Sequence, residues 1–76
     1  NNGTSNGDVY IDDFPLNGDS ATLVFTTFNI GKLLGFEVLD SNNQIVDVLY
    51  TLESDRLIID SNVDLLNHTL RIVHFK

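Results

Sequence analysis

Residues 27–50, "TFNIGKLLGFEVLDSNNQIVDVLY", contain the clearest structural signal in the chain. An Asn-Ile-Gly-Lys turn at residues 29–32 precedes the apolar run 35–40. The short polar segment Ser41-Asn42-Asn43 then separates this run from a second one at residues 45–50. Asn tolerates left-handed backbone angles, so such a connection is typical of a β-hairpin. The stretch therefore predicts two neighbouring strands joined by a tight turn.

The remaining sequence repeats this pattern of short apolar runs separated by turns. Pro15 is expected to end the first strand because proline cannot donate to a sheet ladder, and Asn17-Gly18 is typical of a tight turn. Strands are expected at residues 8–12, 21–28, 35–40, 44–52, 56–60 and 68–75. Strands at spacings of roughly 8–12 residues, without a helical period, predict an all-β fold. We expect a small antiparallel β-sandwich of about six strands, Ig-like or jelly-roll-like.

The chain has 76 residues and a net charge of −7, with 11 acidic and 4 basic side chains. Residues 1–7, "NNGTSNG", contain no apolar side chain and are expected to be a flexible lead or linker. Residues 8–76 are then one β domain. The acidic balance argues against a nucleic-acid partner. No apolar run approaches ~18 residues, so no membrane span is expected.

Several expected strands are apolar on both faces. An antiparallel sheet with one solvated face would instead alternate apolar and polar residues. One explanation is a sandwich with irregular edges, and the other is a second face buried against another subunit. Small domains without cysteine use oligomers or metals for stability, which supports the second explanation. The interface candidates are Val46, Val48, Tyr50, Val73 and Phe75.

Residues capable of chemistry are few. His68 and His74 lie six positions apart on one strand, roughly 20 Å by strand rise, so they cannot share a metal. Each is expected at a rim or edge. No nucleophile–base spacing is visible, and we expect no enzyme activity. Tyr10 and Tyr50 could form a weak sugar-binding platform.

A calcium site is the single cofactor candidate. Asp60, Asn62 and Asp64 have the alternate spacing that opens a calcium-binding loop. Leu65 occupies the position where such a loop needs glycine, and no glutamate follows at the twelfth position. The alternative is an Asx-rich turn between two strands.

The quoted stretch also resembles a small β module of tailed-phage virion proteins, found in tail fibres, tail tips and head decorations. The resemblance covers roughly residues 20–76 and lies in the turn 29–32, the core "FEVLDSNNQIV", and the strands "DRLIID" and "HTLRIVHF". Phe28 stands where the module often has His, and Asn43 replaces a Gly. Asn67-His68 stands where a Gly is expected.

The resemblance implies a non-enzymatic virion structural module that mediates assembly or surface attachment. It implies a virion or extracellular location and a homo-oligomer, with a trimer favoured. Other virion proteins and a host surface glycan or receptor are the further partners. The alternative function is a glycan- or receptor-binding β-sandwich module.

Overall fold

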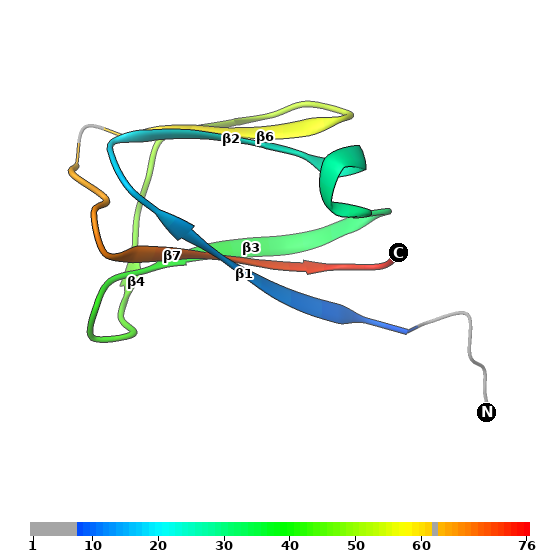
Figure 1. Cartoon of the computed structure of the whole chain (residues 1–76), viewed down its shortest axis with the longest axis horizontal. Helices are drawn as coiled ribbons and strands as arrows, with labels where there is room; N and C mark the ends of the chain where they lie inside the picture. Colours follow the sequence, from blue (N-terminus) through cyan, green and yellow to red (C-terminus); the bar gives the residue numbers. More distant parts are fainter. Residues whose placement is uncertain (1–7, 62) are drawn as a thin grey trace.

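Two antiparallel β-sheets stack as layers in the computed structural model, which describes residues 8–61 and 63–76 (Figure 1). The strand orders are β1-β7-β3-β4 and β2-β6-β5. The strands are β1 (Tyr10–Leu16), β2 (Ser20–Val24), β3 (Leu33–Leu39), β4 (Ile45–Val46), β5 (Tyr50–Leu52), β6 (Arg56–Asp60) and β7 (His68–His74). The predicted antiparallel sandwich is confirmed. The division into one sheet of four strands and one of three matches the number of strands in an Ig-like sandwich, whereas a jelly roll has eight. The expected linker, residues 1–7, lies outside the described residues.

The predicted single strand at residues 44–52 is wrong, because the chain changes sheet there. Ile45 and Val46 pair with the end of β3, whereas residues 50–52 pair with β6 in the other layer. Val46 and Val48 pack against the core along this crossing. The apolar residues on both faces of residues 44–52 are therefore explained by the passage of this segment from one layer to the other, along the core that the two layers share.

Two further boundaries differ from the sequence prediction. β1 continues through Pro15, which lies opposite Thr69 of β7. β1 is an edge strand, and proline is tolerated there because the missing N–H needs no second partner strand. The expected strand at residues 21–28 ends at Val24 and continues as the 3₁₀ turn η2 (Phe25–Phe28). Phe25 thereby enters the core at the end of the sandwich, where the chain passes between layers (Figure 1).

The two turns of the quoted stretch depend on residues that tolerate special backbone geometry. Asn29 adopts φ 59° and Asn43 adopts φ 63°, both in the left-handed region. A Cβ on Gly31 would overlap the backbone carbonyl group of Lys76, so only glycine fits there. The Asp40 carboxylate accepts the backbone N–H groups of Asn42 and Gln44, at 2.8 and 2.9 Å. These hydrogen bonds hold the pKa of Asp40 below its ordinary value, with the Gln44 N–H contributing most.

The core lies between the layers, and β7 contributes most regularly to it. Leu70, Ile72 and His74 alternate along β7 toward the other sheet, and all three are almost fully buried. Other core residues are Leu16, Leu23, Phe25, Ile30, Val38, Leu57, Ile59 and Leu65. β7 is flanked by β1 on one side and β3 on the other. The fold is therefore centred on the last strand of the chain.

This burial pattern predicts different effects for one substitution at two sites. Ile72 is 0% exposed and Ile45 is 69% exposed. Ile72→Val should lower the free energy of unfolding by about 1 kcal/mol because it removes a packed methyl group. Ile45→Val should change it by less than about 0.5 kcal/mol. Urea unfolding of both variants tests this, and equal losses would contradict the assigned core.

Candidate functional site: the open side of the sandwich

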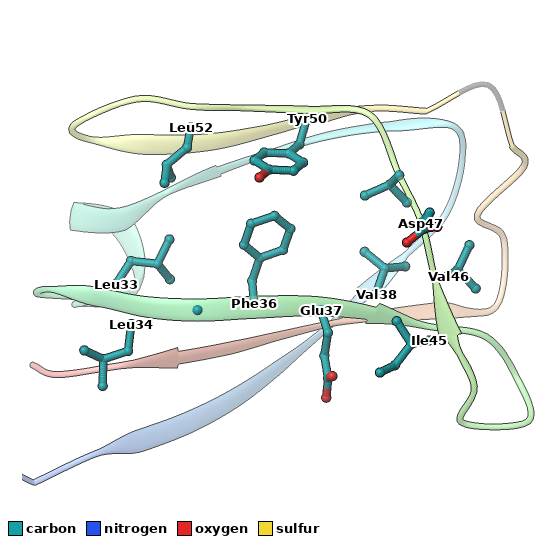
Figure 2. A pocket seen from close by; sticks show the side chains of 12 residues that line it. Leu33, Leu34, Phe36, Glu37, Val38, Ile45, Val46, Asp47, Tyr50 and Leu52 are labelled. Atoms are coloured by element: carbon teal, nitrogen blue, oxygen red, sulfur yellow. The ribbon is translucent and has the colours of Figure 1, made fainter.

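The two sheets do not close against each other along one side. β4 pairs only with Val38 and Leu39, so residues 33–37 of β3 have no strand beyond them among the described residues. The other sheet ends in the three-residue strand β5. An open cleft of about 420 Å³ lies between these two edges (Figure 2). Its lining is Leu33, Leu34, Gly35, Phe36, Glu37, Val38, Ile45, Val46, Asp47, Val48, Tyr50 and Leu52.

An aromatic pair spans the cleft. Phe36 rises from β3 and Tyr50 descends from β5, and the two rings meet edge to face (Figure 2). Their centroids are 4.8 Å apart and their planes are inclined by 83°. Such a pair contributes about 0.5–1.5 kcal/mol beyond the area that it buries. The pair is the direct side-chain bridge between the free edges of the two layers.

The cleft is apolar with an acidic rim. Tyr50 and Leu52 are 55% and 51% exposed, and Leu34 and Ile45 are also exposed. Glu37 and Asp47 are the charged residues among those that line it, and its lining includes no Ser, Thr, Cys, His or Lys. This set of side chains can bury apolar groups of a partner. It offers no pairing of a nucleophile with a base.

The five interface candidates do not form one surface. Val46, Val48 and Tyr50 all line the cleft. Val73 lies on the opposite face of the four-stranded sheet, where it pairs with Ile11. Phe75 follows the end of β7 and is half-buried.

The exposed side of the crossing segment also differs from the expectation. Val46 and Val48 pack partly on the core, while Ile45 and Leu49 are the exposed residues. Sequence analysis missed Leu34, Phe36 and Leu52 as cleft residues. The adjacent Leu33-Leu34 pair was the available signal, because neighbouring residues of a strand point to opposite faces.

The sequence had suggested that His74 lies at a rim or edge. This prediction is wrong, because His74 is buried in the core. β7 is an inner strand of its sheet, and its core face is covered by the second layer. The His74 Nδ1 lies 2.7 Å from the Phe75 carbonyl oxygen, and Nε2 lies 2.7 Å from Asp12 Oδ2. Tyr10 stacks on the ring, with centroids 5.9 Å apart. Both ring nitrogens are therefore engaged by oxygen partners within the fold.

His68 lies in a different setting at the start of β7. It is half-buried, and its Nδ1 is 3.0 Å from the Leu66 carbonyl oxygen. The two histidines share a strand face, as predicted, but they have separate hydrogen-bond partners. No group of three His, Cys, Asp or Glu side chains in residues 8–61 and 63–76 could hold a metal ion.

The calcium candidate gains no structural support. Asp64 accepts the backbone N–H of Leu66 at 3.0 Å, and Ser61 Oγ accepts that of Val63 at 3.1 Å. These are the hydrogen bonds of an Asx-type turn. Asp60 is exposed at the end of β6, and Asn62 lies outside the described residues.

A charge ladder crosses the outer face of the four-stranded sheet. Asp13, Arg71 and Glu37 occupy the same level of β1, β7 and β3. Arg71 donates to both Asp13 carboxylate oxygens, at 3.0 and 3.2 Å, and lies 3.8 Å from Glu37. The hydrogen bonds from Arg71 hold the pKa of Asp13 below its ordinary value, and Asp13 raises the pKa of Arg71. The three charged side chains of this ladder therefore contact one another within the chain.

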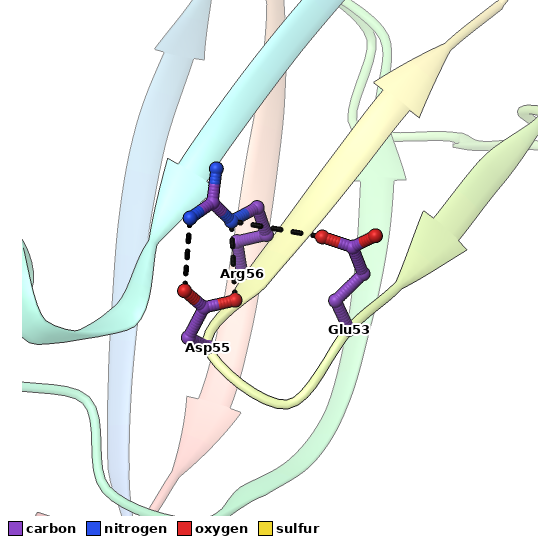
Figure 3. A network of polar contacts seen from close by, with 3 residues as sticks. All are labelled: Glu53, Asp55 and Arg56. Carbon is purple, nitrogen blue, oxygen red and sulfur yellow. Dashed lines mark hydrogen bonds and ion pairs between the residues drawn. The ribbon is translucent and has the colours of Figure 1, made fainter.

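A second ion-pair group lies at the turn between β5 and β6 (Figure 3). Arg56 donates to Asp55 at 2.9 and 3.1 Å and lies 3.6 Å from Glu53. The Glu53 backbone N–H also donates to the Arg56 carbonyl oxygen at 2.8 Å. All three side chains are exposed, so the group shapes the turn and contributes little to stability.

Comparisons with known proteins found no match: no family model, no curated protein and no solved structure matches the chain. No helix in the described part of the chain is long and apolar enough to cross a membrane. Function must therefore be inferred from the chain's own contacts.

Asp12 and Asp13, the two adjacent carboxylates of β1, should contribute unequally to the free energy of unfolding. Asp12→Ala removes the partner of a buried imidazole nitrogen and should cost about 1–3 kcal/mol of unfolding free energy. Asp13→Ala removes an exposed ion pair and should cost less than about 1 kcal/mol. Urea unfolding at neutral pH compares them. An equal or larger loss for Asp13→Ala would show that the His74 contact is not a stabilising interaction.

The lowered pKa of Asp13 predicts a dependence on pH. A depressed folded-state pKa stabilises the fold above the unfolded value of 3.8, and the effect is lost as pH falls through the folded-state pKa. The stability difference between the native chain and Asp13→Asn should be largest above about pH 5 and should shrink in acid. Unfolding curves from pH 7 to strongly acidic solution measure it. A difference that stays constant throughout would contradict this assignment.

Proposed function

We propose that this domain is a non-enzymatic assembly module, in which the open side of the sandwich is covered by another protein chain. The observation that carries the proposal is the apolar cleft between β3 and β5, with Tyr50 and Leu52 half-exposed beside the buried core. Apolar side chains grouped in this way are typical of interaction sites on small proteins. The absence of a nucleophile–base pair from the cleft lining supports a binding role.

The small size of the domain strengthens the proposal. A chain of 76 residues removes only ~60% of its unfolded surface from water. Covering a half-exposed leucine contributes about 1 kcal/mol. Several such side chains on each of two surfaces are needed before burial exceeds the cost of association. The cleft lining offers four exposed apolar side chains, Leu34 and Ile45 from the four-stranded sheet and Tyr50 and Leu52 from β5.

We place the module at the surface of a virion, in a tail fibre, a tail or a capsid decoration. Support comes from the resemblance of residues 20–76 to the phage module. The resemblance includes the turn 29–32, and this turn has a physical function in the fold. Gly31 donates its N–H to the Phe75 carbonyl oxygen at 2.8 Å and has no room for a side chain. The same surface would present the module to other virion proteins or to a host receptor.

Association in solution tests the assembly proposal. The native chain should form a concentration-dependent oligomer by sedimentation velocity. Leu52→Ser should raise the dissociation constant about five- to tenfold, because a half-exposed leucine no longer becomes buried. Leu66→Ser is the matched control, since Leu66 is 52% exposed but lies outside the cleft lining. This control should leave the dissociation constant unchanged.

A monomer of 8.5 kDa at every concentration up to the millimolar range would contradict homo-oligomeric assembly. The alternative, a glycan- or receptor-binding module, would then be favoured by saturable binding to a glycan array. That binding should disappear in Tyr50→Ala, because Tyr50 is the exposed aromatic residue of the cleft. Binding that survives this substitution would exclude the cleft as the glycan site.

A further inference from the structure

We propose that the buried His74 ring is held as an imidazolium by Asp12, and that this proton fastens the start of β1 to the end of β7, so that the first strand detaches in alkaline solution. The His74 side chain is fully buried, and each ring nitrogen lies 2.7 Å from an oxygen atom. The pair lies at the β1 edge of its sheet, and the cleft lies at the other edge. The proposal is therefore independent of the assembly function.

The Phe75 carbonyl oxygen determines the proton on Nδ1 of His74. A carbonyl oxygen can only accept a hydrogen bond, so the Nδ1 beside it must donate. The same oxygen also accepts the backbone N–H of Gly31 at 2.8 Å, which holds the acceptor in place from the side of β3. Nε2 is then the ring nitrogen whose protonation can vary.

The Asp12 carboxylate requires a second proton on the ring. Nε2 of His74 and Oδ2 of Asp12 are at hydrogen-bond distance, and such a contact needs one proton between the two atoms. Imidazole is the stronger base of the two groups, so this proton belongs to the ring. The Asp12 side chain is 52% exposed, and water therefore stabilises its negative charge. The imidazolium is inside the fold, and its counter-charge lies at the surface.

Asp12 is the charged group in direct contact with the ring. The face of the Tyr10 ring, which stacks on His74 with centroids 5.9 Å apart, also attracts a cation. Lys76 opposes this effect, since its Nζ lies 5.1 Å from the centroid of the same Tyr10 ring, but water screens this exposed charge. The 3₁₀ turn η2 contributes no charged residue at this end of the other layer (Figure 1). The remaining charged residues that flank the strands here are exposed or half-exposed: Asp8, Lys32, Glu53, Asp55 and Arg56.

The first half of β1 depends on this contact because it has little other side-chain attachment. Residues 10–13 are exposed, whereas Phe14 and Leu16 pack with the core. When Nε2 releases its proton to water, its lone pair faces a carboxylate oxygen, and two acceptors repel each other. Residues 10–12 should then separate from β7, while residues 14–16 stay attached through the core.

The proton count gives the direction of the pH dependence. The folded chain holds the Nε2 proton, whereas an unfolded histidine loses it above roughly pH 6.5. Folding therefore takes up one proton above this pH, and the folding equilibrium constant should fall by up to about tenfold for each further pH unit. Asp12→Asn should abolish this slope, because the amide of Asn can donate to a neutral Nε2. Asp13→Asn should keep it, since Asp13 bonds to Arg71 instead.

Urea unfolding of the native chain and both variants between about pH 6 and pH 9 measures these slopes. Titratable groups elsewhere contribute equally to all three chains, so the difference between the Asp12 and Asp13 variants isolates the pair. Equal slopes in the two variants would overturn the proposal.

Nuclear magnetic resonance of the ring nitrogens tests the native chain without any substitution. At about pH 8, both nitrogens of His74 should carry a proton. His68 is the internal reference, because its one hydrogen-bond partner within residues 8–61 and 63–76 is the Leu66 carbonyl oxygen, which requires a proton on Nδ1 alone. Raising the pH further should shift the backbone amide signals of residues 10–12 together with the loss of the Nε2 proton, and leave those of residues 14–16 in place. A bare Nε2 on His74 at about pH 8 would overturn the proposal and leave the assembly function untouched.

Discussion

The shortness of β4 and β5 is the constraint on which the open side of this sandwich, and the function proposed for it, depends. A strand of two residues and a strand of three residues cannot cover the edges of the two layers. The sandwich is therefore packed in its middle and open along one side. Phe36 and Tyr50 bridge that opening, and the apolar residues around them lie at the boundary between core and solvent. The proposed assembly surface results from the same packing that forms the core.

The packed middle is organised by β7, which pairs with strands on both sides and buries every second side chain. His74 is the exception in this apolar face because it needs polar partners. A buried polar group must be hydrogen-bonded to avoid a large desolvation cost. Asp12 and the Phe75 carbonyl oxygen supply these bonds, and Tyr10 covers the ring. The first strand is thereby attached to the last one by a side-chain contact as well as by the backbone ladder.

Sequence reasoning predicted those features that depend on local chemistry. The hairpin at Asp40 formed as expected, because a carboxylate next to Asn residues can satisfy the turn N–H groups. The strand at residues 56–60 also has the predicted limits. Local signals failed where neighbouring strands decide the outcome. Pro15 stays within β1 because β1 is an edge strand, and His74 is buried because β7 is an inner strand.

The candidate site was only partly predictable for the same reason. Val46, Val48 and Tyr50 were identified from their apolar pattern, and they do line one cleft. The pattern could not show that residues 47–49 cross between layers, so the more exposed side of the segment was assigned incorrectly. The contribution of β3 to the cleft depends on how far β4 extends along it. A pairing length of this kind is set by tertiary contacts and has no local sequence signal.

The account depends most on the proposal that a second chain covers the open side of the sandwich between β3 and β5. Backbone amide hydrogen exchange, compared between dilute and concentrated protein, measures this coverage residue by residue. We expect slower exchange at high concentration for amides within residues 33–37, with unchanged exchange in β2 at the edge of the other sheet. Equal exchange of the β3 amides at both concentrations would contradict the account.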